Sequence, residues 1–185
     1  MAEGATGIRL RPDVRSPGDD PLAIWRKAAE LGITVSCGGG RDAFADDAFA
    51  AVFEACPTLP IVIEHLGGLK WSDLDGSGAR PKMFDLARFP NAYVKIHGLG
   101  EFSQRAMPVR EPFPFVEPIA PLIELAYEAF GASRMMWGSD YPPVSMREGY
   151  GNALRFTQAR LADKSDEEQA LIFGGVAARL FGFNE

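Results

Sequence analysis

Short apolar runs alternate with amphipathic stretches along almost the whole chain. Five of these runs predict strands, at 7–11, 33–37, 61–65, 91–97 and 134–139. Between them, apolar residues recur at helical spacing, as Phe49, Val52, Phe53 and Cys56 do. Strands that alternate with helices indicate a parallel sheet covered by helices.

Capping signals predict where several helices begin and end. We expect a helix over 20–31, because Asp20 is a good cap and a glycine follows the last residue. Apolar spacing predicts a second helix over 119–130 and a short one over 82–88. Ser165 and Glu168 form a capping box that opens the last of two C-terminal helices.

Composition limits the class of protein. The 185 residues fit a single domain over 1–185 with a sizeable core. The net charge of −6 is dispersed, which argues against nucleic acid and anionic membranes as partners. No apolar run approaches the roughly 20 residues of a membrane span, and the first residues carry no signal region. We expect Cys37 and Cys56 to be free, buried thiols in a reducing cytoplasm.

Residues that can carry chemistry follow the ends of the predicted strands. Arg11, His65, His97 and Asp140 each lie at or directly after the end of such a run. In barrels and open α/β sheets, ligands bind at the edge where the carboxyl ends of the strands meet. The sequence therefore predicts a site for a small-molecule substrate at this edge.

Asp140 is the strongest candidate. A turn or a helix cap also explains an aspartate before a proline. Its position directly after an apolar strand, with Gly138 leaving space beside it, favours a functional role. We expect Asp140 to act as a general base toward water, as a metal ligand, or as both in turn.

His65 is the second candidate, at the end of the run 61–65. A lone histidine is more often structural than catalytic. Here Gly67 and Gly68 follow, and they allow a ligand to approach the backbone closely. We expect the neutral imidazole to bind a divalent metal or to polarise a substrate carbonyl.

The remaining candidates have two interpretations each. Lys95 and Glu64 are out of place in apolar strands, and we expect a buried ion pair, with a substrate contact of Lys95 as the alternative. His97 shares strand parity with Lys95 and makes either a polar core contact with a neighbouring strand or a substrate contact. Arg11, which shares parity with Arg9, either grips a substrate carboxylate or forms a surface ion pair.

Three segments together resemble successive strand motifs of the amidohydrolase-related family. They are IVIEHLGG at 61–68, NAYVKIHG at 91–98 and MWGSDYP at 136–142. The stretch 177–181 also resembles the closing helix of that family, so the resemblance covers essentially the whole chain. Members are TIM-barrel hydrolases and decarboxylases. The resemblance implies an α/β fold, a partial (β/α)8 barrel with about five parallel strands and flanking helices.

The resemblance also implies roles by position. His65 resembles the mid-barrel histidine that binds metal or substrate, and Asp140 the late-strand aspartate that binds metal or acts as the base. Lys95 matches a lysine often found in its strand, whereas His97 stands where the family often has serine. The sequence is closer to the sugar-lactone and pyrone-lactone hydrolases than to the decarboxylases. Some of these lactonases resemble metal enzymes that have dispensed with the metal.

One departure from the family concerns the metal. The family's first strand ends in His-x-His, which supplies two ligands, and this sequence contains no such motif. A divalent metal, with zinc as the first choice, would find an incomplete ligand set in His65 and Asp140, because catalytic zinc usually takes three protein ligands.

A second departure concerns the strand count. A closed barrel needs eight strands, and we count five. We expect open edges at 7–11 and 134–139, which pair with another chain as a homo-oligomer or show that the sequence is a fragment of a longer protein. An in-frame His-x-His strand upstream of Met1 would support the fragment.

The leading hypothesis is a hydrolase that opens a lactone or a related ester-like ring. Asp140 would activate water, His65 would polarise the carbonyl or hold a metal, and Arg11 would orient a substrate carboxylate, with His97 and Lys95 as further substrate contacts. The first alternative is a decarboxylase of an aromatic or unsaturated carboxylic acid. The second is an inactive truncated chain or a subunit that needs a partner.

Overall fold

A parallel sheet organises the molecule. The computed structural model describes residues 4–75, 79–106 and 114–183. Within them, five strands form one sheet in sequential order, and every neighbouring pair is parallel. The strands are β1 (Gly7–Leu10), β2 (Thr34–Cys37), β3 (Ile61–Ile63), β4 (Ala92–Ile96) and β5 (Met135–Trp137). All five lie inside the runs predicted as strands, and the arrangement is the predicted part of a (β/α)8 barrel.

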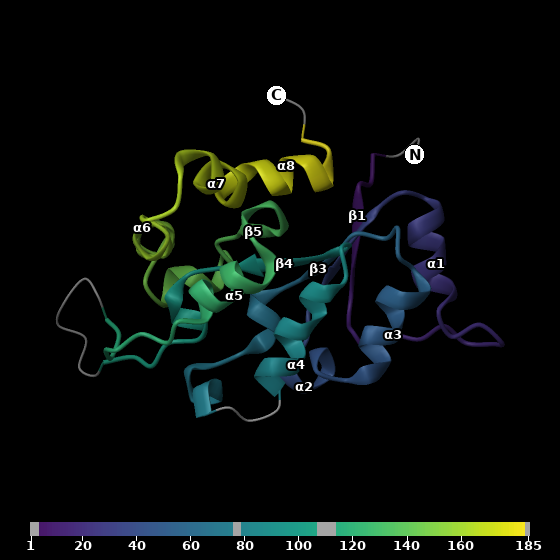
Figure 1. Ribbon diagram of the computed structural model, residues 1–185, viewed down its shortest axis with the longest axis horizontal. Coiled ribbons are helices and arrows are strands. Elements are labelled where there is room, and N and C mark those ends of the chain that lie inside the picture. Colours follow the sequence, from purple (N-terminus) through teal and green to yellow (C-terminus); the bar gives the residue numbers. More distant parts are fainter. Residues whose placement is uncertain (1–3, 76–78, 107–113, 184–185) are drawn as a thin grey trace.

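Helices connect the strands and follow the last one (Figure 1). They are α1 (Ala23–Glu30), α2 (Arg41–Phe44), α3 (Asp47–Ala55), α4 (Ala79–Asp85), α5 (Leu122–Phe130), α6 (Tyr150–Arg160), α7 (Asp166–Ala170) and α8 (Val176–Phe181). A wider helical turn over Leu171–Gly175 joins α7 to α8. The capping box at Ser165 is present and opens α7, as predicted.

Two predicted helix starts were wrong. The residues after Asp20 form a turn, in which its carboxylate accepts a hydrogen bond from the Leu22 N–H at 3.0 Å, and α1 begins only at Ala23. Helix α5 begins at Leu122 rather than at 119. Pro121 explains the later start, because a proline disfavours helical backbone in the residue before it.

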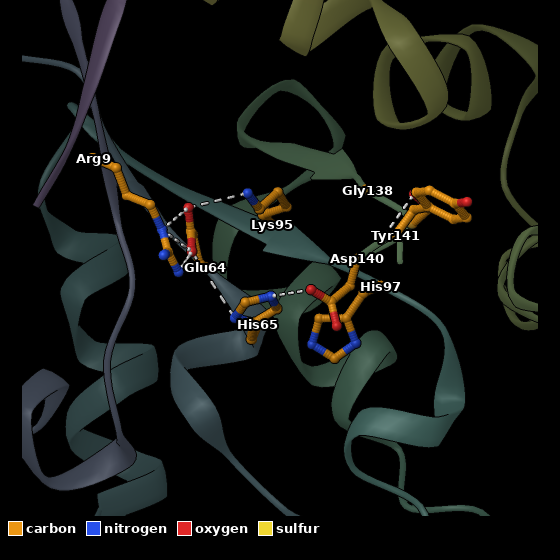
Figure 2. Close-up of a pocket in the computed structure, with 9 residues that line it drawn as sticks. Arg9, Glu64, His65, Lys95, His97, Gly138, Asp140 and Tyr141 are labelled. Atoms are coloured by element: carbon orange, nitrogen blue, oxygen red, sulfur yellow. Dashed lines mark hydrogen bonds and ion pairs between the residues drawn. The ribbon is translucent and has the colours of Figure 1, made fainter. Parts of the chain in front are cut away.

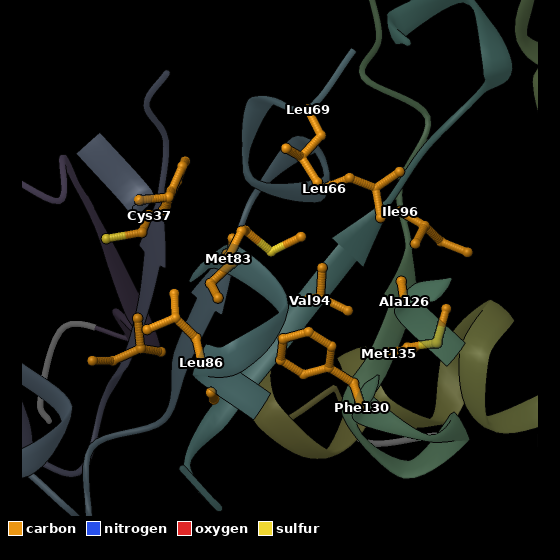
Figure 3. Close-up of a cluster of buried hydrophobic side chains, with 14 of the residues drawn as sticks. Cys37, Leu66, Leu69, Met83, Leu86, Val94, Ile96, Ala126, Phe130 and Met135 are labelled. Atoms are coloured by element: carbon orange, nitrogen blue, oxygen red, sulfur yellow. The ribbon is translucent and has the colours of Figure 1, made fainter. Parts of the chain in front are cut away.

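One face of the sheet packs against α1, α3, α4 and α5 and forms the main hydrophobic core. Strand residues on this face, such as Val35, Ile63 and Val94, are fully buried. Figure 3 shows Met83 of α4 and Phe130 of α5 beside Val94. Burial of such a side chain contributes about 1.5–3 kcal/mol, so this layer holds the sheet in place.

The opposite face is divided between an apolar end and a polar end. At the apolar end, Val62, Tyr93 and Met136 pack against the C-terminal helix through Val176 and Leu180, among others. Figure 1 shows α8 beside the start of β1. Helix α8 therefore covers the amino-terminal half of this face and leaves the carboxyl ends of the strands to the polar site.

The open sheet agrees with the expected edges. Strands β1 and β5 lie at the two ends of the sheet formed by the described residues. Pairing of these edges with a second copy of the chain stays a prediction. Cys37 and Cys56 are free and buried, as expected. Among the described helices, none has both the length and the apolar character that crossing a membrane requires.

Candidate active site

Unusual backbone conformations place two side chains at the carboxyl edge of the sheet. Directly beyond β3 and Glu64, His65 has a φ of 53°, and Asp140, three residues after β5, has a φ of 54°. Positive φ is uncommon for residues other than glycine and costs energy. Gly67 continues the turn, where a Cβ would lie 2.4 Å from the side chain of Met83, so no larger residue fits there. The fold thus holds both candidates in strained positions, which is typical of functional sites.

His65 and Asp140 face each other, as Figure 2 shows. The Nε2 atom of His65 lies 3.3 Å from Oδ1 of Asp140. Their side chains are 28% and 22% exposed, so both reach solvent from a partly enclosed position. The sequence predicted that these two residues belong to one site, and the structure brings them together.

A cluster of charges lies next to this pair on the same face. Glu64 accepts hydrogen bonds from Arg9 at 2.7 Å and from Ser36 at 2.6 Å. The Nζ of Lys95 lies 3.3 Å from Oε1 of Glu64, and Nδ1 of His65 lies 4.0 Å from Oε2 of the same carboxylate. The predicted ion pair of Glu64 with Lys95 is confirmed. Burial alone would raise the pKa of Glu64, but the hydrogen bonds from Arg9 and Ser36 and the nearby positive charges lower it to about 2.

His97 lies beneath the pair and is fully buried. Its Nδ1 lies 3.0 Å from the carbonyl oxygen of Gly98, and its ring centre lies 5.2 Å from that of His65. Burial lowers the pKa of His97 to about 3, so the ring is neutral near pH 7. Within the described part of the chain, its Nε2 has no hydrogen-bond partner. The polar contact of the ring is with the next residue, Gly98, rather than with a neighbouring strand as one interpretation expected, and the residue lines a cavity.

These residues surround a cavity of about 420 Å³. A volume of this size is within the range of small-molecule sites. The ionised side chains on its wall carry opposite charges: two are cationic, Arg9 and Lys95, and two are acidic, Glu64 and Asp140. The complete lining is Arg9, Glu64, His65, Lys95, His97, Gly138, Ser139, Asp140 and Tyr141.

Arg11 is not part of this cavity, contrary to its predicted place among the site residues. Its side chain is exposed and its Nε lies 3.2 Å from Oδ1 of Asp13, which is the surface ion pair that the sequence left open. Strand β1 ends at Leu10, and the chain turns at Pro12, so the shared parity with Arg9 does not extend to Arg11. Arg9, two residues earlier, lines the cavity instead.

Sequence reasoning missed Arg9 and Arg147. A signal for Arg9 existed, because it is a charged residue within an apolar strand, as Lys95 and Glu64 are. Arg147 donates a hydrogen bond from Nη2 to Oδ2 of Asp140 at 3.1 Å. It lies in an irregular turn after β5, where no periodic pattern indicates which way a side chain points.

The family follows from a comparison that covers nearly the whole chain. A model of the amidohydrolase family matches residues 2–183. The chain belongs to this family. The resemblance seen in the three strand motifs is thereby confirmed, and the polar cavity lies at the edge of the sheet where the motifs end.

Known relatives include lactone hydrolases. The chain is 30% identical over 131 residues to an L-fucono-1,5-lactonase of Burkholderia ambifaria. Its fold is similar to a crystal structure of an amidohydrolase from Burkholderia multivorans with bound zinc, with a TM-score of 0.74 and 22% identity. A probable 2-pyrone-4,6-dicarboxylic acid hydrolase from Acinetobacter baumannii, solved with citric acid, gives a TM-score of 0.70 at 20% identity. The likeness to the two solved structures establishes the fold.

The matches cover only part of each relative. The alignment with the lactonase spans 68% of this amidohydrolase and 42% of the lactonase. The zinc-bound structure is covered over 64% of its length and the pyrone hydrolase over 66%, by 96% and 98% of this chain. The chain therefore spans about two thirds of these solved barrels.

The donor atoms of the residues that the structure describes do not make a complete zinc site. The family is generally metal-dependent, and one solved neighbour contains zinc. In the described residues, no three His, Cys, Asp or Glu side chains are placed so that they could hold one metal ion. His65 and Asp140 would offer two ligands, whereas catalytic zinc usually takes three from the protein. Zinc therefore stays a prediction.

Proposed function

We propose that this amidohydrolase domain opens a lactone ring, with Asp140 as the general base and His65 as the donor to the carbonyl oxygen. The observation that carries the proposal is the facing pair of an aspartate and a histidine, 3.3 Å apart, on the wall of the cavity. Further support comes from the similarity to an L-fucono-1,5-lactonase.

The reaction needs one base and one hydrogen-bond donor. A water molecule beside Asp140 gives a proton to the carboxylate while its oxygen bonds to the carbonyl carbon of the lactone. With the lactone bound between the two side chains, the Nε2–H of His65 turns from Oδ1 of Asp140 to the carbonyl oxygen. There it stabilises the negative charge that develops on that oxygen. When the ring C–O bond breaks, the proton on Asp140 passes to the leaving oxygen. Lactone and water become one hydroxy acid, and both side chains return to their starting states.

The charges around the cavity favour a hydroxylated substrate without several carboxylates. The cations Arg9 and Lys95 are both engaged by the carboxylate of Glu64. A substrate dianion would have to compete with Glu64 for them and would also face Asp140. Hydroxyl groups can both donate to Glu64 and accept from Lys95, so a sugar lactone suits this wall. We therefore infer a sugar lactone as the substrate class.

Replacement of Asp140 by asparagine tests the proposal. Because the amide cannot accept the proton of water, we expect Asp140→Asn to lower kcat at least 100-fold, in the range of general-base catalysis. L-Fucono-1,5-lactone and other sugar 1,5-lactones serve as substrates, and proton release is followed with a pH indicator above the spontaneous background.

Asp163→Asn is the matched control, since this aspartate is exposed and its carboxylate is paired with Lys164. It should leave kcat unchanged. Near-normal turnover in Asp140→Asn, or no turnover of any lactone by the wild-type protein, contradicts the proposal. Release of carbon dioxide from an aromatic carboxylic acid, without ring opening, would instead support the decarboxylase.

A further inference from the structure

Arg147 lies behind the catalytic pair and contacts acidic groups on several sides. Its Nη2 is 3.1 Å from Oδ2 of Asp140, Nη1 is paired closely with Glu101, and Nε is 3.8 Å from Oε2 of Glu148. The side chain is 15% exposed. Two of its nitrogen atoms are thus held by Asp140 and Glu101, and Nε lies at ion-pair distance from Glu148 without a hydrogen-bond partner among the described residues.

The partners of Arg147 are themselves fixed. The side chain of Glu148 is fully buried, and its Oε1 accepts the N–H of Gly100 at 3.0 Å. Gly98 and Gly100 make room for this carboxylate, because a Cβ on either would lie 2.1–2.2 Å from a Glu148 oxygen. The segment after β4 and the turn after β5 are thus tied together through Arg147 and Glu148. Arg147 cannot swing away without breaking this connection.

The two oxygens of Asp140 consequently have different partners. Oδ2 accepts from Arg147, and Oδ1 faces His65 at 3.3 Å. A carboxylate bound through a single oxygen rotates freely about its last bond, whereas partners on both oxygens define its plane. Of these two partners, His65 lines the cavity and Arg147 does not.

We propose that Arg147 is a positioning residue that holds Oδ2 of Asp140 so that Oδ1 faces the reacting water. Its kinetic consequence rests on the lactone hydrolysis proposed above. Proper placement of a catalytic group contributes strongly to rate, and a small displacement costs much of it. Because Arg147 does not line the cavity, its loss should affect the chemical step and leave substrate binding almost unchanged.

The kinetic test compares Arg147→Met, Arg147→Lys and the control Arg105→Met. Arg105 is an exposed arginine that donates to the carbonyl oxygen of Met146, so its loss removes the same charge near the same turn. We expect kcat to fall about 10- to 100-fold in Arg147→Met with KM within about twofold, and Arg147→Lys to recover part of the loss. Arg105→Met should match the wild type.

Combination with Asp140→Asn separates positioning from a general effect on the fold. If Arg147 acts through Asp140, adding Arg147→Met to Asp140→Asn lowers kcat no further. An equal loss in both backgrounds overturns the proposal. A rise in KM with unchanged kcat does so as well, because it would assign Arg147 to substrate binding.

A structural readout keeps this inference separate from the proposed activity. In crystal structures of the wild type and of Arg147→Lys and Arg147→Met, we expect the Asp140 carboxylate to keep one orientation only where a cation remains at 147. An unchanged orientation in Arg147→Met overturns the inference. If the wild-type protein opens no lactone, the proposed function fails, and the crystal structures still decide whether Arg147 positions Asp140.

Discussion

The two faces of the sheet are made from alternate residues of the same strands, and they serve different ends. Ile63 and Val94 point to the core face, which α1, α3, α4 and α5 cover, and are fully buried among apolar side chains. Glu64 directly follows Ile63, and Lys95 directly follows Val94. Both point to the other face and pair with each other at the cavity wall. A shift of one residue in register would exchange these environments.

Residues that stabilise the fold and residues that can carry chemistry therefore lie on different faces of the sheet. The core face contains the apolar packing contacts that hold the strands in place. On the cavity face, every ionised group on the wall has an oppositely charged or hydrogen-bonded partner, as Glu64 does with Arg9 and Lys95. We expect substitutions on the core face to cause the larger losses in the free energy of unfolding. Substitutions on the cavity face should cause smaller losses, and these should depend on pH.

The largest loss of stability should come from a substitution in the apolar layer at the core face. Phe53 of α3 is buried, and its ring packs against those of Phe49 and Phe89 with centroids 5.1 Å apart in each case. Phe53→Ala should lower the free energy of unfolding by about 3–5 kcal/mol, because it removes apolar contact and leaves a cavity. Urea unfolding measures the loss. Met146→Ala, which truncates an exposed side chain, should change it by less than about 0.5 kcal/mol. Equal losses in the two variants would contradict the packing described here.

A smaller effect should follow from Glu64 on the cavity face. Glu64→Gln leaves Arg9 and Lys95 without their anionic partner and should lower the free energy of unfolding by about 1.5–3 kcal/mol at pH 7. The pKa of Glu64 is lowered from 4.5 to about 2 in the folded protein. Its charge therefore stabilises the fold above pH 4.5, and this contribution is lost as the pH falls from about 4.5 to 2.

Stability profiles against pH separate this effect from ordinary acid unfolding. The contribution of Glu64 in that window is at most about 3 kcal/mol, since one pKa unit corresponds to about 1.4 kcal/mol. Urea midpoints at pH 7, 4.5 and 3 should fall less steeply in Glu64→Gln than in the wild type. Glu30→Gln, which removes an exposed carboxylate paired with Lys27, should retain the wild-type slope. Parallel slopes in all three proteins would argue against a low pKa of Glu64.

The smallest effect should distinguish two arginines of one segment. Arg9→Met removes two donors from the buried carboxylate of Glu64 and should cost about 1–2 kcal/mol, although its own side chain is 67% exposed. Arg11→Met breaks only an exposed pair with Asp13 and should cost less than about 0.5 kcal/mol. Both are measured by urea unfolding. A greater loss of stability in Arg11→Met than in Arg9→Met would contradict the placement of Arg9 on the cavity wall and of Arg11 on the surface.

The sequence was sufficient to predict a residue's environment where that environment depends only on the strand in which the residue lies. The apolar runs located all five strands, and a charge inside an apolar run predicted the pair of Glu64 with Lys95. His65 and Asp140 were found because they follow strand ends, which meet at one edge of a parallel sheet. Their detailed roles stay predictions.

Features that depend on turns and on tertiary packing were beyond sequence reasoning. Parity placed Arg11 beside Arg9, but the chain leaves the strand at Leu10 and the side chain turns to Asp13. Arg147 reaches Asp140 from an irregular turn, and periodicity carries no information there. The family resemblance implied a closing helix at 177–181, but it could not tell which face of the sheet that helix covers.

The position of α8 has a consequence for how the protein is made. The Thr34 hydroxyl donates to the carbonyl oxygen of Leu180, which is 146 residues later in the chain. During synthesis, the sheet can form while Val62 and Met136 still lack the helix that covers them. Until α8 leaves the ribosome, the nascent chain therefore presents an apolar surface to the cell, which makes it a candidate for chaperone binding at that stage.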